Sequence, residues 1–363
     1  MTTATQYPTQ SVADRLAALM RPDIARLTAP PYIPPGIAVS RRIFFGAEVM
    51  KRHITSECWQ VQIGFQDAGY ELTGHALPYP ESNVRLAIEN SDRSTATVII
   101  QDRREWDREA QMCYDPMAHF HEAGYLAERP DVFKLTLLKD HHNDREYNRN
   151  HAKEIGCHAW LAYYHPVIAH WLAPYTRPEH MIRIYHGIDT DDVPSFGTDR
   201  APRALLSGAI SREAYPLRWR LRHEAHLIPE MSVKHHPGYK ARGHFSPEYM
   251  RELAGYRVSI CTTSLYGYAL RKIVEGVAAG CRVVTDLPVD DVMPGIDENL
   301  IRVRPDIPTL EFREVLRDAI ENYDAAAQQY WSERAVEHYE YRGLYARLAG
   351  EVEAMRQRYE ATV

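Results

Sequence analysis

The chain alternates twice between short apolar runs and longer helix-like stretches, and an acidic segment without periodicity, 190–202, separates the two series. This alternation predicts parallel strands joined by crossover helices that cover both faces of a sheet. Because the series occurs twice, we expect two Rossmann-like α/β domains. The first series has strands at 42–45, 96–101, 133–138, 157–163 and 182–185 with a helix at 59–68, and the second has strands at 203–208, 232–236, 256–262, 282–286 and 300–303.

The length of 363 residues exceeds one ordinary core and suits two domains. A helix is expected at 11–27, followed by the proline-rich break 30–35, as an arm packed on the first domain. The region 310–359, rich in Ala, Glu, Arg and Leu, predicts two or three helices with Gly343 or Gly350 as breaks. The predicted division is an N-terminal helical arm at 1–35, a first domain at 36–189, a linker at 190–202, a second domain at 203–340 and a C-terminal helix at 341–363.

Bulk composition favours a small-molecule or glycan partner over a polyanion. The chain is 45% hydrophobic and 25% charged, as ordinary globular proteins are, and carries a formal net charge of −6. It therefore lacks a global basic footprint for nucleic acid, although a local basic patch can still bind one. No apolar run reaches the length of a membrane span, and the N-terminus lacks the layout of a signal peptide. Five widely spaced cysteines indicate reduced core residues and hence a cytoplasmic protein: Cys58, Cys113, Cys157, Cys261 and Cys281.

The stretch 271–286 carries the most chemical information. The basic pair Arg271 and Lys272 lies one helical turn before Glu275, so cation and carboxylate share one face of a helix. Small residues follow, which let the helix pack close to a sheet, and Gly280 can end it. Such a helix offers cations to a diphosphate and a carboxylate to ribose hydroxyls. On an arbitrary amphipathic helix, the same residues are more often a solvated face.

This string resembles the C-terminal signature of GT-B glycosyltransferases, in which a glutamate before a small-residue run and an apolar strand holds the donor ribose. It is similar in particular to the spore-coat-maturation-type (CgeB-like) enzymes and their retaining relatives of glycosyltransferase group 1, which are family-4-like. The resemblance implies that Glu275 binds the ribose. The family's pattern has two glutamates flanking seven residues, and Gly267 stands at the position of the first. That glutamate addresses the transferred sugar in the retaining enzymes, so retention and inversion both stay open here.

The resemblance implies two Rossmann-like domains with parallel sheets facing across a cleft, and a C-terminal helix that returns to the N-terminal domain. It also implies transfer of a hexose or pentose from a nucleotide-sugar donor, expected to be a UDP-sugar, to a glycan or small-molecule acceptor. We expect Lys272, Arg212 and helix dipoles to neutralise the diphosphate without a metal ion. The Asp-x-Asp of Asp189 and Asp191, which holds a divalent cation in a different glycosyltransferase fold, falls in the predicted linker.

Further donor-binding candidates follow the strands of the second domain, where open α/β sheets place ligands. Arg212 and Arg218 suit a diphosphate, although Arg218, among other arginines, also fits an exposed basic helix face. The hydroxyls at 262–264 suit donor contact or helix capping. The segment 235–239 resembles the segment that lines the nucleobase pocket in this kind of fold, and its proline and glycine equally suit a plain turn. With the domain-junction residue His186, the donor-binding set is Gly208, Arg212, Arg218, His236, Gly238, Thr262, Thr263, Ser264, Arg271, Lys272, Glu275 and His186.

Polar clusters also end strands of the first domain, which is expected to hold the acceptor. A carboxylate or imidazole there would take the proton of the acceptor hydroxyl in an inverting reaction, or stabilise the leaving phosphate in a retaining one. Histidines at strand ends are also often hydrogen-bonded structural residues. The catalytic candidates are Asp102, His141 and His142.

Three other functions stay open at the level of sequence. One is a phage-type glycosyltransferase acting on hydroxymethylated DNA bases, a less favoured reading because of the net negative charge. Another is a non-catalytic nucleotide-sugar-binding protein, and the third is a nucleotide-sugar epimerase of GT-B architecture. A DNA acceptor would require a basic stripe, for which the candidates are Arg41, Arg42, Lys51, Arg52, Arg103 and Arg104.

Overall fold

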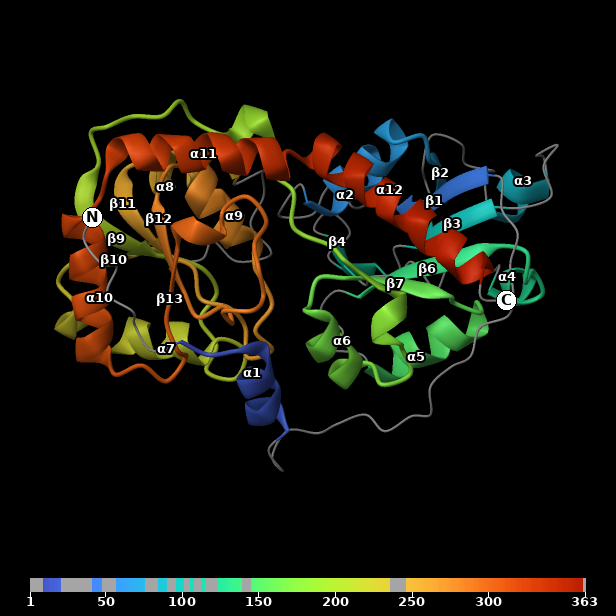
Figure 1. Ribbon diagram of the computed structural model, residues 1–363, viewed down its shortest axis with the longest axis horizontal. Coiled ribbons are helices and arrows are strands. Elements are labelled where there is room, and N and C mark those ends of the chain that lie inside the picture. Colours follow the sequence, from blue (N-terminus) through green and yellow to red (C-terminus); the bar gives the residue numbers. More distant parts are fainter. Residues whose placement is uncertain are drawn as a thin grey trace. The chain divides into compact units, whose positions relative to one another are not determined.

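The chain divides into two units, and each unit is built from two separate segments of the chain. Unit 1 comprises Met1–Ile24 and Tyr185–Glu340, and unit 2 comprises Ala25–Ile184 and Tyr341–Val363. Each unit contains a parallel sheet (Figure 1). The computed structural model describes residues 9–20, 41–47, 57–75, 84–89, 96–100, 105–107, 112–114, 123–138, 145–235 and 246–361.

Unit 2 holds a parallel sheet with the strand order β2-β1-β3-β6-β7-β8. Every residue of its strands β6 and β7 is buried, as expected for parallel strands covered on both faces. The strands are β1 (Arg41–Ala47), β2 (Glu71–His75), β3 (Ala96–Ile100), β6 (Phe133–Leu138), β7 (Ala159–Ala162) and β8 (Met181–Arg183), and β4 (Glu105–Asp107) pairs with β5 (Met112–Tyr114) in a separate antiparallel ladder.

The last helix of the chain, α12 (Tyr341–Glu360), packs on α2 (Glu57–Asp67) of unit 2 (Figure 1). The ring of Tyr345 stacks on Phe65 with 5.9 Å between centroids. A Cβ at Gly64 would lie only 2.5 Å from the Tyr345 ring, so the glycine allows the two helices to approach closely. The predicted return of the C-terminal helix to the N-terminal domain is therefore confirmed. The other helices of unit 2 are α3 (Val84–Glu89), α4 (Ala123–Ala127), α5 (Arg145–Glu154), α6 (Pro166–Leu172) and the 3₁₀ turn η3 (Pro178–His180).

Unit 1 holds a second parallel sheet, with the strand order β10-β9-β11-β12-β13. The carboxyl ends of β9, β11 and β12 are buried at Leu206, Ile260 and Thr285, and the loops that follow them meet at one edge of the sheet. This edge is where open α/β sheets bind ligands. The strands are β9 (Ala201–Leu206), β10 (Met231–Val233), β11 (Tyr256–Ile260), β12 (Arg282–Thr285) and β13 (Leu300–Arg302).

The apolar core of unit 1 lies between β9, β11, β12 and the helix α10. On the other side, α9 contacts α11, and Ser332 Oγ donates a hydrogen bond of 2.5 Å to the carbonyl of Ala278. The helices of unit 1 are α1 (Val12–Leu19), α7 (Pro216–His223), α8 (Ser246–Leu253), α9 (Arg271–Ala278), α10 (Thr309–Glu321) and α11 (Ala325–Tyr339), with 3₁₀ turns η4 (Thr190–Asp192), η5 (Ala225–Leu227) and η6 (Asp297–Asn299).

Two expectations about helices are wrong. The arm helix α1 packs on unit 1, which holds the second series of strands, because Arg15 bonds to residues of the β11 and β12 loops. Gly343 and Gly350 do not break the C-terminal region, since both lie inside α12, where packing on α2 outweighs the weak helix propensity of glycine. The breaks fall instead at 322–324, where Asp324 caps α11, and at Glu340.

Candidate functional site

Two cationic side chains converge on Gly208, in the loop that follows β9. A Cβ at this position would lie 2.7 Å from Arg218 Nη1 and 3.3 Å from Lys272 Cε. Gly208 has a φ of +114°, a conformation that residues with side chains rarely adopt. The glycine therefore leaves room for both cations at the carboxyl edge of the sheet. We call Gly208, Arg218 and Lys272 the cation cluster.

Arg218 is held by the loop that follows β11. Its side chain is buried, with 2% of the residue exposed, which excludes an exposed basic helix face. Its Nε donates to Thr262 Oγ1 at 3.0 Å, and its Nη2 donates to the Thr262 carbonyl at 2.8 Å. The third nitrogen, Nη1, donates to the carbonyl of Ala209 at 3.1 Å, and the guanidinium lies 4.2 Å from the centre of the Tyr215 ring. Arg218 thus has a fixed orientation beside Gly208.

Lys272 reaches the same place from the first turn of α9. Its Nζ lies 3.9 Å from the centre of the Tyr249 ring, and Tyr249 Oη is 2.7 Å from Ser207 Oγ. Loss of hydration lowers the pKa of Lys272, while the negative charge of Glu275 acts to raise it. Within the described residues the ammonium has no hydrogen-bond acceptor or ion-pair partner. Its N–H donors are therefore available to an anion.

The helix α9 combines the predicted ribose ligand with close packing on the sheet. Arg271 Nε and Glu275 Oε1 form a buried ion pair at 2.9 Å, so one carboxylate oxygen is already held. A Cβ at Gly276 would lie 3.0 Å from Val283 Cγ2, which shows how closely the helix approaches β12. The helix ends in a Schellman motif: Gly280 has a φ of +80°, and Cys281 N donates to the carbonyl of Gly276 at 2.9 Å. The predicted roles of these glycines in packing and termination are confirmed.

The charges around Lys272 favour a multivalent anion. Arg218 and Arg271 both act to lower the pKa of Lys272, whereas Glu275 acts to raise it. Three cations therefore face one acidic carboxylate at the start of α9. The N-cap residue Leu270 provides no side-chain acceptor for the first-turn N–H groups, so the positive end of the helix dipole adds to the same field. A diphosphate matches this arrangement in charge.

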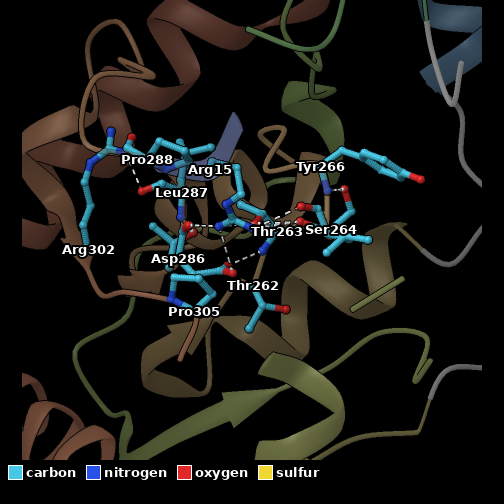
Figure 2. A network of polar contacts seen from close by, with 12 residues as sticks. Arg15, Thr262, Thr263, Ser264, Tyr266, Asp286, Leu287, Pro288, Arg302 and Pro305 are labelled. Atoms are coloured by element: carbon cyan, nitrogen blue, oxygen red, sulfur yellow. Dashed lines mark hydrogen bonds and ion pairs between the residues drawn. The ribbon is translucent and has the colours of Figure 1, made fainter. Parts of the chain in front are cut away.

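A second network joins α1 to the loops after β11 and β12, and it surrounds Arg15 (Figure 2). Arg15 is 3% exposed, and its Nη2 donates to the Asp286 carbonyl at 2.6 Å and forms an ion pair with Asp286 Oδ2 at 3.3 Å. The same nitrogen contacts Thr263 Oγ1 at 3.4 Å, while Nη1 donates to the carbonyl of Ser264 at 3.3 Å. Asp286 Oδ1 accepts a hydrogen bond of 2.6 Å from Thr263 N. We call Arg15, Asp286 and the loop 262–267 the Arg15 network.

The remaining predicted site residues that the structure describes differ in exposure and in their partners. Arg212 is exposed, and its guanidinium lies 5.3 Å from the centre of the Trp219 ring. Thr262, Thr263 and Ser264 are buried, and their hydroxyls accept hydrogen bonds from Arg218, Arg15 and Tyr266 N respectively. His186 is buried with its ring 6.3 Å from that of Tyr268, and Asp189 Oδ1 accepts from Asp191 N at 3.1 Å.

Five candidates lie outside the described residues, namely Asp102, His141, His142, His236 and Gly238. Sequence patterns also missed four side chains that shape the site. Ser207 and Tyr249 have no motif, although Ser207 directly precedes Gly208 at a strand end, which is a usable signal. Arg15 and Asp286 are far apart in sequence, and no local pattern links them.

The described part of the chain shows neither a metal-ligand cluster nor a membrane-spanning helix. It contains no group of three or more His, Cys, Asp or Glu side chains arranged to hold a metal ion. Among the helices described, none is both long enough and apolar enough to cross a membrane. Cys157, Cys261 and Cys281 are buried thiols outside any disulfide, as expected for core residues.

No family model and no curated protein sequence matches the chain. It is similar to an α-glucosyltransferase solved in complex with UDP and a 13-mer DNA containing a central A:G mismatch, with a TM-score of 0.52 and 11% identity over 86% of this chain and 100% of that one. It also matches a sucrose-phosphate synthase from Thermosynechococcus elongatus (TM-score 0.49, 11% identity, 88% and 100% coverage) and a glycosyltransferase from Rickettsia africae (0.47, 12%, 87% and 98%). The first likeness, together with the two parallel sheets, confirms the predicted GT-B fold class.

Proposed function

We propose that the chain is a glycosyltransferase that moves a hexose or pentose from a nucleotide-sugar donor, expected to be a UDP-sugar, to an acceptor hydroxyl. The observation that carries the proposal is the cation cluster, in which Arg218 and Lys272 meet over Gly208 at the carboxyl edge of the unit 1 sheet. A fixed guanidinium and an ammonium that has no ion-pair partner in the described part of the chain suit a diphosphate. The resemblance of the stretch 271–286 to CgeB-like and group 1 enzymes supports the same donor.

The reaction breaks the bond between the sugar's anomeric carbon and the diphosphate oxygen, and it forms a bond from that carbon to the acceptor oxygen. Negative charge develops on the departing diphosphate, and Lys272 and Arg218 would stabilise it. Glu275, oriented by Arg271, would accept hydrogen bonds from the ribose hydroxyls. The acceptor proton would pass to a base, for which Asp102, His141 and His142 remain the proposed candidates.

The proposal is tested by nucleotide binding and donor turnover. Isothermal titration of UDP, UDP-sugars and other nucleoside diphosphates into the wild type should identify one tight ligand. Lys272→Met should weaken the binding of that ligand by about 10- to 100-fold, since a hydrogen bond to a charged group contributes roughly 1.5–3 kcal/mol. Arg257→Met is the matched control, because it removes one cation from the amino end of β11. Binding of no nucleotide, or equal weakening by both variants, would refute the proposed site.

A nucleotide-sugar-binding protein without transfer activity is the second candidate, and one observation favours it. Gly267, at the position of the first family glutamate, has a φ of +66°, and the space beside it is filled by Arg15. No carboxylate of residue 267 can therefore address the sugar. Mass spectrometry of the bound donor after incubation with candidate acceptors separates the two functions, because only a transferase yields free UDP and a glycosylated product.

The acceptor is proposed to be a glycan or small molecule. DNA is less favoured, because Arg42, the member of the basic stripe whose side chain is described, forms an ion pair with Glu353 at 3.5 Å. The cytoplasmic location predicted from the cysteines also remains a proposal.

A further inference from the structure

The N-terminal helix α1 is bound to the loops that build the proposed donor site. Besides the Arg15 contacts, Val12 N donates to Asp290 Oδ1 at 2.5 Å, and Val289 N donates to the carbonyl of Gln10 at 2.8 Å. Ser11 and Asp14 close a capping box at the start of the helix. The segment 10–15 is thus attached at several points along 286–290, and it presents a single buried cation to the adjoining loop.

Two consecutive residues, Thr262 and Thr263, connect the Arg15 network to the cation cluster. Thr262 holds Arg218 with both its hydroxyl and its carbonyl, and the next residue, Thr263, bonds to Asp286 through its backbone N–H and to Arg15 through its hydroxyl. Arg15 also bonds the carbonyls of Ser264 and Leu265, at 3.3 and 3.4 Å. Removing Arg15 would leave three backbone carbonyls and the Asp286 carboxylate without their cation in a buried setting, so the loop would have to rearrange.

Arg15 also occupies the space beside Gly267. A Cβ at Gly267 would lie 3.0 Å from Arg15 Cγ and 3.2 Å from Arg15 Nε, so a larger residue there would displace the arginine. The loop 262–267 is therefore shaped by a side chain about 250 positions earlier in the chain, whose contacts span sequence separations of 248 to 271.

We propose that Arg15 is a positioning residue for donor binding: it fixes the loop 262–267, so that Thr262 holds Arg218 in the orientation that a diphosphate requires. This inference rests on the proposed function. Arg15 itself touches no ligand in this scheme, because its guanidinium is buried among protein carbonyls and Asp286. In this scheme, the helix α1 is required for the geometry of the donor site.

The test compares two equally buried arginines of unit 1. Arg15→Met keeps the bulk of the side chain and removes the guanidinium. Arg200→Met is the matched control, since Arg200 is 5% exposed and bonds the carbonyls of Gly197, Tyr256 and Ala279 at the amino edge of the same sheet. The Kd of UDP, or of the nucleoside diphosphate that the wild type binds most tightly, is measured by calorimetry below the melting temperatures of both variants.

We expect Arg15→Met to raise this Kd about tenfold, which corresponds to roughly 1.4 kcal/mol, and Arg200→Met to lower the melting temperature without changing the Kd. A wild-type Kd in folded Arg15→Met would overturn the inference and leave the proposed function standing. Failure of the wild type to bind any nucleoside diphosphate would overturn both.

A variant at an exposed residue keeps the test decisive if Arg15→Met does not fold. Asp290→Ala removes the acceptor that holds Val12 N and leaves the buried side chains untouched. A Kd raised by about two- to threefold supports the attachment of α1 as a requirement for donor binding. An unchanged Kd in Asp290→Ala, with Arg15→Met unfolded, would overturn the inference.

Discussion

Gly208→Ala is the sharpest test of the cation cluster, because the structure gives two separate costs for one methyl group. The backbone at a φ of +114° is unfavourable for any residue with a Cβ, at roughly 1–3 kcal/mol. The new Cβ would also lie 2.7 Å from Arg218 Nη1, which must move and lose its bond to Ala209. A hydrogen bond from a charged donor contributes about 1.5–3 kcal/mol, so we expect unit 1 to lose roughly 2.5–6 kcal/mol of unfolding free energy.

The same change should weaken nucleotide diphosphate binding, because the displaced guanidinium no longer lies beside Lys272. Two control variants separate the costs. Gly69→Ala, at a φ of +90° with no atom within 4 Å of the new Cβ, measures backbone strain alone in unit 2. Gly197→Ala has neither strain nor crowding and should be neutral. Denaturant unfolding gives the free energies, and calorimetry gives the Kd. A Gly208→Ala protein with wild-type affinity would refute the assignment of the diphosphate to this cluster.

Three further predictions concern pH. Because the pKa of Lys272 is lowered, its ammonium loses its proton at a pH lower than the usual 10.5. The affinity for UDP should therefore fall as the pH is raised toward 10.5, whereas Lys272→Arg should show no such fall. Burial raises the pKa of Cys281 to about 12, so the folded protein retains a proton that the unfolded chain releases above pH 9. The unfolding free energy of the wild type should therefore fall by roughly 1.4 kcal/mol per pH unit above pH 9. The same dependence of unfolding free energy on pH in Cys281→Ala would contradict this prediction. Burial lowers the pKa of Lys134 to about 8, so between about pH 8 and 10.5 the unfolded chain holds a proton that the folded protein has released. The unfolding free energy should therefore rise over this pH range, and comparing the unfolding curves of wild type and Lys134→Met measures the rise.

Much of the fold could be predicted from local pattern. The mainly apolar sequences of β6 and β7 follow from burial on both faces of a parallel sheet, and the small residues of α9 follow from its close approach to β12. The edge strand β2, with the sequence Glu-Leu-Thr-Gly-His, lacks this apolar signal and could not be recognised. The hairpin of β4 and β5 is three residues a side and equally weak as a pattern.

The site could be predicted only in part, because its geometry depends on contacts between distant segments. Both Arg212 and Arg218 follow β9 in sequence, yet Arg218 alone lies beside Leu217 and Leu221 on the buried face of α7. That spacing was a usable signal, since a basic residue within an apolar stripe must be held by partners. The docking of Arg15 has no such signal, because its partners lie at sequence separations of 248 or more.

Because each unit joins an early and a late stretch of the chain, the order of synthesis and the order of assembly cannot coincide. A ribosome makes Ala25–Ile184 long before α12 emerges. The surface of α2 around Gly64 and Phe65 therefore lacks its partner Tyr345 while all of Tyr185–Glu340 is translated. Likewise α1 is among the first residues made, and the loop that receives Arg15 comes some 250 residues later. Fragments cut at residue 184 or 340 would therefore carry an unfilled docking face, and we expect them to depend on chaperones or to associate with the missing piece supplied as a separate chain.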